Sequence, residues 1–299
     1  MKAKAVLAAP ILLLLVFLCN FGSRFIPDTI IGAETDPYIA ASLIQLFILA
    51  IPALIFCRLR GGGYMKKMRF RMFRSGHTAL ILFAVMLMFF GSCGINYLMH
   101  TLFPNANIAS GYDSSDGFAG GLYLVLTMAI IPAITEEFLF RGVIIAEYEH
   151  EGVPAAVLVS SLTFAMLHFS FARLPAYLFC GFILAMVLYA TRSIFAAMLV
   201  HMLNNTATIF FGDLVYRVVS SQGIALFCFI LVSVILVSAI LTFSECERIY
   251  AGYGVLNEDS SYTGKRKKGY AATGIFQSIF TPFFMALVIL YIIIAAIGN

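Results

Sequence analysis

Charged residues are scarce in this sequence: they make up 11% of its 299 residues, while 62% are hydrophobic and the mean hydropathy is +0.97. Soluble domains carry about 25% charged and about 45–50% apolar residues. So few charges cannot cover the exterior of a water-soluble protein of this length, and so much apolar surface cannot be hidden in its core. The composition therefore excludes a soluble enzyme and predicts a polytopic membrane protein.

Motifs of several functional classes are absent. The six cysteines form no CxxC pair and no Cys/His ladder, which argues against a disulfide framework or a zinc knuckle. The net charge of +4 is modest, and the basic residues lie in loops between apolar segments, so we expect no nucleic-acid partner. The chain also lacks GxSxG, HExxH and paired aspartates, which disfavours serine, zincin and aspartyl versions of intramembrane proteolysis.

Nine apolar stretches are candidates for membrane spans, since a spanning helix needs about 20 mainly apolar residues. They predict an all-α bundle of eight or nine transmembrane helices, forming one integral membrane domain over residues 1–299. The first stretch is expected to be a retained helix, because no small-residue cleavage site follows it. The stretches are 5–22, 38–57, 78–99, 118–146, 154–171, 174–191, 194–211, 222–243 and 275–297.

The lysines and arginines predict the orientation of these spans. With the N-terminus inside, all of the 19 basic residues except Arg24, Arg173 and Arg217 lie on or toward the cytoplasm. The loops are short, which fits a multi-pass protein of a bacterial cell membrane with a cytoplasmic N-terminus. The longest loop, 244–274, is predicted to be cytoplasmic, and its basic run 265–268 is expected to contact anionic lipid headgroups.

Ionisable residues inside the spans are informative, because each is costly in lipid unless it is paired or hydrated. The fourth stretch contains Glu136, Glu137 and Arg141, and its apolar pattern continues to about Ala146, so the helix is predicted to run through them. Glu137 and Arg141 are i,i+4 with the acid first, the favourable order for an ion pair. Such a pair can simply hold helices together or can support a site. Glu136 points about 100° away and is a candidate general base.

Polar residues of two further helices are predicted to meet Glu136. A rise of about 1.5 Å per residue places His168 of the fifth stretch at a depth similar to that of Glu136. His201 and Asn205 of the seventh stretch are i,i+4, share one face and reach the same region. Taken singly, each is more often a packing or hydrogen-bonding residue. Their convergence on three helices favours a functional site.

These residues, in this order, resemble the CPBP family of intramembrane proteases, the CAAX prenyl protease 2 / bacteriocin-processing family that is also called Abi. The family pattern is Glu-Glu-x-x-x-Arg, then Phe-x-x-x-His, then His-x-x-x-Asn, on three helices. The matching motifs occupy residues 136–141, 164–168 and 201–205. The resemblance covers about residues 118–211 and predicts a protease core on three central helices.

The resemblance implies an endopeptidase that hydrolyses a peptide bond of a membrane-associated protein or peptide within the lipid bilayer. Glu136 would activate the attacking water, and His168 would help to position it. His201 and Asn205 would stabilise the tetrahedral oxyanion. Supporting roles, toward the site or toward the substrate backbone, fall to Glu137, Arg141 and Phe164.

A metal is the contested feature of such a site. Zinc takes nitrogen and oxygen ligands, and Glu136, His168 and His201 would be its ligands here. Asn205 is a poor zinc ligand but a good oxyanion donor, so we expect no obligatory cofactor. Two other functions stay open: a non-enzymatic membrane protein for bacteriocin immunity, and a proton-coupled transporter with its relay in these spans.

Overall fold

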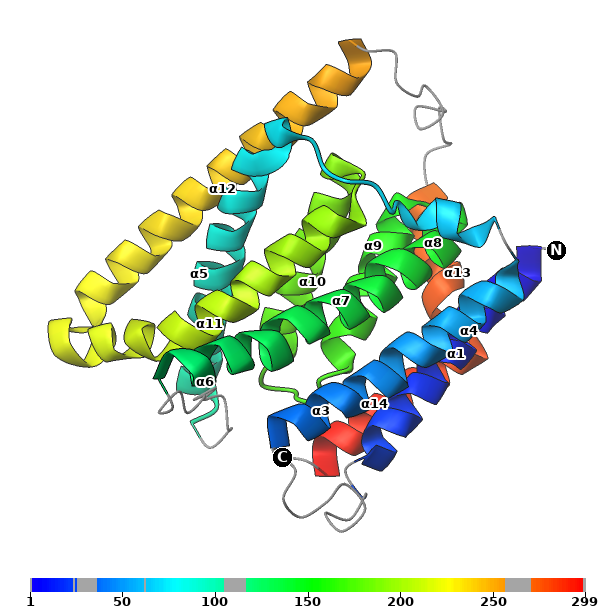
Figure 1. Ribbon diagram of the computed structural model, residues 1–299, viewed down its shortest axis with the longest axis horizontal. Helices are drawn as coiled ribbons and strands as arrows, with labels where there is room; N and C mark the ends of the chain where they lie inside the picture. The colour runs from blue at the N-terminus through cyan, green and yellow to red at the C-terminus, as the bar shows by residue number, and fades with distance from the viewer. Residues whose placement is uncertain are drawn as a thin grey trace.

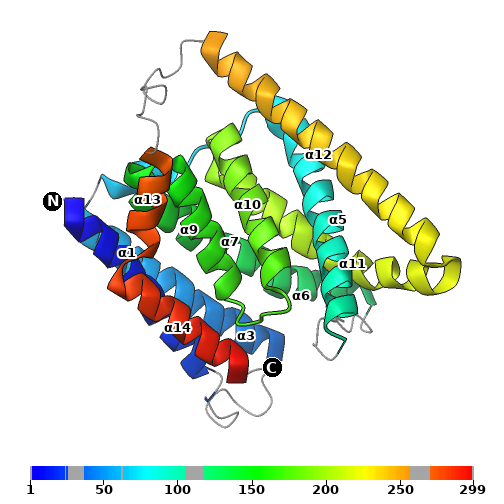
Figure 2. The same cartoon turned by 180° about the vertical axis from the view of Figure 1, so that it is seen from behind.

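The computed structural model describes residues 2–23, 25, 37–61, 63–104, 117–255 and 270–297. Within these ranges every regular element is a helix, which confirms the all-α prediction. In lipid a chain must satisfy its backbone hydrogen bonds internally, and long apolar runs do so as helices. Figures 1 and 2 show these helices packed side by side in one bundle.

The element bounds follow the predicted stretches, with shifts at their ends. The α-helices are α1 (Lys2–Ser23), α3 (Pro37–Gln45), α4 (Ile51–Arg60), α5 (Thr78–Leu102), α6 (Gly117–Leu124), α7 (Ile131–Glu137), α8 (Ile145–Tyr148), α9 (Val153–Met166), α10 (Leu174–Thr191), α11 (Ile194–Gln222), α12 (Ile224–Val255), α13 (Tyr270–Ile279) and α14 (Pro282–Ile297). The π-helical segments are η1 (Leu46–Ala50), η4 (Val125–Ile130) and η5 (Phe138–Ile144), and the 3₁₀ segments are η2 (Tyr64–Met68), η3 (Ser75–His77) and η6 (Glu149–Glu151).

Membrane-spanning character is clear in the described residues. Six helical segments are long and apolar enough to cross a bilayer, or seven if the bent pair α13–α14 forms one span. Two shorter apolar helices, Ala8–Ser23 and Val153–Met166, occupy two more of the predicted stretches. Large apolar side chains face outward, as Phe229 and Ile240 do on α12. The chain is therefore a polytopic membrane protein, with fewer full-length spans than the nine stretches suggested.

The last predicted span, 275–297, is not one straight helix. The chain bends by 67° between α13 and α14. Pro282 opens α14, where proline's missing N–H costs nothing. The Thr281 hydroxyl accepts a hydrogen bond from the backbone N–H of Phe284 at 3.3 Å, which caps the new helix. Proline and a threonine cap together explain the break.

Two other predicted boundaries also differ from the structure. The span 154–171 ends as a helix at Met166, and the turn that follows holds Phe169 with a positive φ of 48°. The loop predicted over 244–274 begins later, because α12 continues to Val255. Its basic run 265–268 lies outside the described residues.

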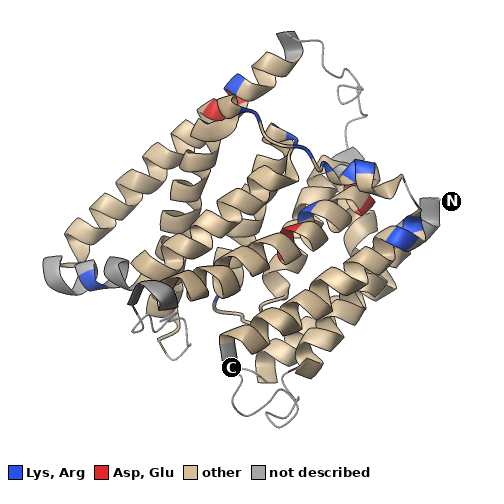
Figure 3. Cartoon of the chain, in the orientation of Figure 1, with Lys and Arg blue, Asp and Glu red and all other residues tan. Residues whose placement is uncertain are grey.

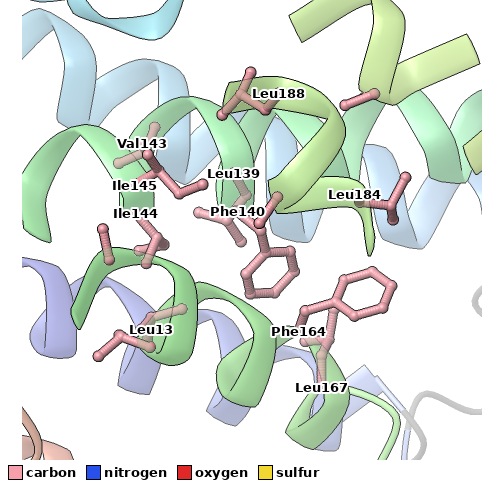
Figure 4. Close-up of a cluster of buried hydrophobic side chains, with 14 of the residues drawn as sticks. Leu13, Leu139, Phe140, Val143, Ile144, Ile145, Phe164, Leu167, Leu184 and Leu188 are labelled. Atoms are coloured by element: carbon pink, nitrogen blue, oxygen red, sulfur yellow. The ribbon is translucent and has the colours of Figure 1, made fainter. Parts of the chain in front are cut away.

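The central span, α6 to η6, is about half buried against the other helices, most completely over α7 and η5. Figure 4 shows Leu139, Phe140 and Ile144 of η5 among side chains from α1, α9 and α10. Leu139, Phe140 and Ile144 are completely buried. This packing fixes the segment that carries the ionisable residues.

Charged residues lie mainly at one end of the bundle, with a separate group on α7 and η5 (Figure 3). At the charged end, the end of α4 and the connection between η2 and η3 are each held to the central span by an ion pair. Arg60 pairs with Glu147, and Arg69 pairs with Glu149. The connection between α4 and α5 is thus attached to the same helix that carries the interior charges.

Candidate active site

A cavity of about 250 Å³ lies inside the bundle, between α3, α5, α7, α10 and α11. Glu136, His168, His201 and Asn205 all line it. The structure thus brings the polar residues of three separate sequence segments to one place. His168 reaches the cavity from the turn that follows α9 rather than from within a helix.

The helix around Glu136 is wider than an α-helix on both sides, because η4 precedes α7 and η5 follows it. Local π-helical turns are frequent at functional sites. Pro132 contributes to this widening of the helix, because it has no N–H to donate to the carbonyl of Met128, four residues earlier. The side-chain amide of Asn205 donates to that carbonyl at 3.4 Å. A proline on one helix therefore creates an acceptor that holds Asn205 on another.

Glu136 is 5% exposed, and the structure holds one of its two oxygens by a direct hydrogen bond. Its Oε1 accepts a hydrogen bond from the side-chain amide of Gln45, at the end of α3. Its Oε2 lies 3.9 Å from Nε2 of His201. That separation is too long for a direct hydrogen bond, and it is short enough for one water molecule to contact both atoms.

The predicted ion pair between Glu137 and Arg141 is present, and both side chains are fully buried. Arg141 Nη1 donates to Glu137 Oε1 at 3.0 Å, and Nη2 donates to the carbonyl of Gly181 at 2.9 Å. His201 Nδ1 donates to the same Glu137 oxygen at 2.8 Å. Neither Glu137 nor Arg141 is among the described residues that line the cavity. The pair therefore holds the His201 ring without itself lining the cavity.

Phe164 lies at the centre of a group of rings. Its ring meets the His168 ring edge-on at 5.3 Å and the His201 ring at 5.7 Å, and the Arg141 guanidinium lies 4.6 Å from its centroid. Tyr177 of α10 stacks on the His168 imidazole, with the two ring centroids 3.6 Å apart. Both histidine rings are thus limited in rotation by aromatic neighbours.

The tautomer of His168 follows from its partner. His168 Nδ1 lies 3.1 Å from the backbone carbonyl of Phe164. A carbonyl only accepts, so Nδ1 carries the hydrogen in this bond. The neutral ring then offers Nε2 as an acceptor, suited to receive a hydrogen bond from water.

The sequence also predicted which residues would bind a metal, if one were present: Glu136, His168 and His201. Among the residues that the structure describes, no three His, Cys, Asp or Glu side chains converge as metal ligands. Nδ1 of each histidine is engaged, by Glu137 and by the Phe164 carbonyl, but metal-bound histidines make the same contacts and bind through Nε2. It is the lack of convergence that does not fit tetrahedral zinc.

Several cavity residues were missed by sequence reasoning, which weighed ionisable residues first. Gln45 and Asn204 are uncharged, and an isolated amide in an apolar stretch is a weak signal. Tyr177 reads as an ordinary aromatic residue of a span. The lone glutamine within 38–57 was the one available signal for the partner of Glu136.

Comparison with known families adds an independent finding. Residues 118–207 match the family model described as type II CAAX prenyl endopeptidase Rce1-like. No curated protein and no solved structure gives a significant match to the chain. The matched segment runs from α6 into α11 and contains Glu136, His168, His201 and Asn205. This segment of the membrane bundle is therefore similar to the Rce1-like type II CAAX prenyl endopeptidases, which are proteases.

Proposed function

We propose that this protein is an intramembrane endopeptidase that hydrolyses a peptide bond of a membrane-associated protein or peptide. One observation carries the proposal: a carboxylate, two imidazoles and an amide line one cavity, and all four come from the segment that matches the protease family. They are the side chains of Glu136, His168, His201 and Asn205. A base together with hydrogen-bond donors for the oxyanion is the set of groups needed to add water to an amide.

Glu136 is the proposed general base. Gln45 engages Oε1 and leaves Oε2 directed toward His201, where a water can contact both. Nε2 of His168 accepts the other hydrogen of that water and orients it. Glu136 takes the proton as the water oxygen bonds to the substrate carbonyl carbon, and it then gives the proton to the amine released when the C–N bond breaks. General base catalysis of this kind contributes typically about 10²–10⁴-fold.

Asn205 and His201 are the proposed oxyanion donors. The Asn205 amide has two N–H groups, and one of them donates to Met128, which leaves the second for the oxyanion. A His201 ring protonated on both nitrogens donates Nδ1–H to Glu137 and Nε2–H into the cavity. Removing one such donor costs about 10²–10³ in kcat in a well-studied protease.

Glu137, Arg141 and Phe164 are proposed to position His201 rather than to contact substrate. Arg141 is anchored at the Gly181 carbonyl and at Glu137, and Glu137 holds Nδ1 of His201. This chain fixes the ring orientation before substrate arrives, which is how electrostatic stabilisation avoids reorganisation during the reaction. We propose no obligatory metal, since the candidate ligands do not converge in the described residues.

The membrane arrangement stays as the sequence predicts it: a bacterial cell membrane, with the end of the bundle rich in lysine and arginine facing the cytoplasm. The basic residues between Arg58 and Arg74 gather at that end (Figure 3), as the positive-inside rule expects of a cytoplasmic face. Cysteine labelling from either side of the membrane tests this placement.

The protease proposal is tested by comparing membrane peptides from cells with wild-type protein and with Glu136→Gln. This substitution keeps the size of the side chain and removes the base. The matched control is Glu245→Gln, which alters a carboxylate paired with Arg248 on α12. Fragments lost with Glu136→Gln and kept with the control support proteolysis and identify the substrate. Identical fragments in all three strains refute it.

A further inference from the structure

A second polar surface lines the cavity beside the proposed catalytic residues. It is formed by α5 and α11, which pack against each other, and none of its members is ionisable. We call it the acceptor wall, and its residues are Ser92, Asn96, Asn204 and Thr208. Asn204 directly precedes Asn205 and lies three residues after His201 on α11.

The two hydroxyls of the acceptor wall can offer only acceptors to a ligand. Ser92 donates its proton to the carbonyl of Phe89 at 2.9 Å, and Thr208 donates its proton to the carbonyl of Asn204 at 2.9 Å. A hydroxyl has one proton and two lone pairs. With the proton used inside the helix, the hydroxyl oxygen of each of these cavity-lining residues is left as an acceptor.

The two amides add two more acceptors. Oδ1 of Asn96 and Oδ1 of Asn204 are buried and have no hydrogen-bond partner within the described part of the chain. The Nδ2 of Asn204 uses one of its two N–H groups to donate to Oδ1 of Asn205 at 3.4 Å, and Oδ1 of Asn204 is left without a donor. Buried acceptors without partners are rare in native proteins and each calls for an explanation.

A neutral donor is the ligand chemistry that fits this surface. Glu136 is the sole acidic residue among the described residues lining the cavity, so the wall is not built for a cation. A peptide entering from the membrane brings backbone N–H groups that must be hydrogen-bonded at that depth. An extended peptide lying beside Asn204 would also pass the Asn205 amide, where the oxyanion forms in the proposed reaction.

We propose that the acceptor wall is a subsite for the main chain of an extended peptide, whose amide N–H groups it accepts next to the scissile bond. This inference rests on the proposed function and deepens it. Main-chain contacts do not read side chains, so the subsite accepts varied sequences. A residue without an N–H at the position facing Asn204, such as proline, is disfavoured.

The test measures binding in the Glu136→Gln protein, reconstituted in lipid nanodiscs, so that no cleavage occurs. The probe is a fluorescent tetra-alanine amide, together with depsipeptides in which one N–H at a time is replaced by an ester oxygen. One ester position is expected to weaken binding about tenfold, the size of a single buried hydrogen bond. In Glu136→Gln/Asn204→Leu this preference for amide over ester is expected to disappear.

Two further variants separate the subsite from a folding effect. Asn204→Asp keeps the acceptor oxygen and is expected to keep the preference for amide over ester. Thr206→Val is the control on the same helix; Thr206 donates to the Met202 carbonyl and is not among the described residues that line the cavity. The readout is the ratio of the affinities for the amide and for the ester, both measured on the same variant. A smaller folded fraction therefore does not change it.

Equal binding of all esters, a preference that survives Asn204→Leu, or no peptide binding would each overturn the subsite. The proposed hydrolysis has a separate readout in the Glu136-dependent fragments. Asn204-dependent binding without such fragments would uphold the subsite and refute the protease. Glu136-dependent fragments together with Asn204-independent binding would uphold the protease and refute the subsite.

Discussion

Gly181 offers a sharp test of how α9 and α10 position Arg141. A Cβ added at Gly181 would lie 2.9 Å from Cα, 3.0 Å from Cβ and 3.1 Å from the carbonyl oxygen of Ser161. Two of these atoms belong to the backbone and cannot rotate away. The same glycine supplies the carbonyl that accepts from Arg141 Nη2. Gly181→Ala must therefore push α10 away from α9 and stretch the Arg141 contact.

The expected loss can be estimated from its parts. Overpacking by one methyl group costs about 1–3 kcal/mol, and a weakened hydrogen bond to a charged group costs up to about 1.5–3 kcal/mol. Alanine recovers about 1 kcal/mol through its better helix propensity. If the Arg141 contact is lost, the net expectation for Gly181→Ala is a loss of about 1.5–5 kcal/mol in the free energy of unfolding.

Gly252→Ala on α12 is the matched control, since a Cβ there meets no atom within 4 Å. It is expected to stabilise the protein by up to about 1 kcal/mol. The assay is denaturant unfolding of both variants and of wild type in one detergent. If Gly181→Ala unfolds at the same denaturant concentration as Gly252→Ala, the close packing of α9 on α10 described above is wrong.

Three further predictions follow from the site. Arg141→Leu leaves Glu137 buried without its cation and is expected to cost about 3–5 kcal/mol in unfolding measurements; the double variant Arg141→Leu/Glu137→Leu should recover part of this, and strictly additive losses would contradict the pairing. Gln45→Leu removes the donor that holds Glu136 Oε1 and is expected to lower kcat about tenfold with little change in thermal unfolding; an unchanged kcat would remove Gln45 from the site. Prolonged treatment with a zinc chelator is expected to leave cleavage intact, whereas a loss that added zinc restores would show that the reaction needs a metal.

Much of the site was predictable because intramembrane polar residues are few. Glu136 and His168 could be placed at similar depth from the rise of a helix and the position of the turn between two spans. The ion pair of Glu137 with Arg141 followed from their spacing on one helix. These predictions needed only helical geometry and the rule that charges in lipid require partners.

Contacts that depend on how distant helices pack were not predictable. Gln45 meets Glu136 because α3 lies against α7, and no spacing within one segment encodes that contact. His168 was expected inside a helix, yet it lies in the turn beyond Met166, since apolar residues continue past the helix end. The link from Pro132 through the Met128 carbonyl to Asn205 also joins two helices, so it appears only in three dimensions.

The central claim is that Glu136 activates water for peptide-bond hydrolysis, and it is tested most directly in proteoliposomes in ¹⁸O-labelled water. The substrate is the membrane peptide identified from the Glu136-dependent fragments, and the initial cleavage rate is measured for wild type, Glu136→Gln and Glu245→Gln. The expected result is one ¹⁸O atom in the new carboxylate, with a rate at least about 100-fold lower for Glu136→Gln alone. Cleavage at the wild-type rate by Glu136→Gln would contradict the claim.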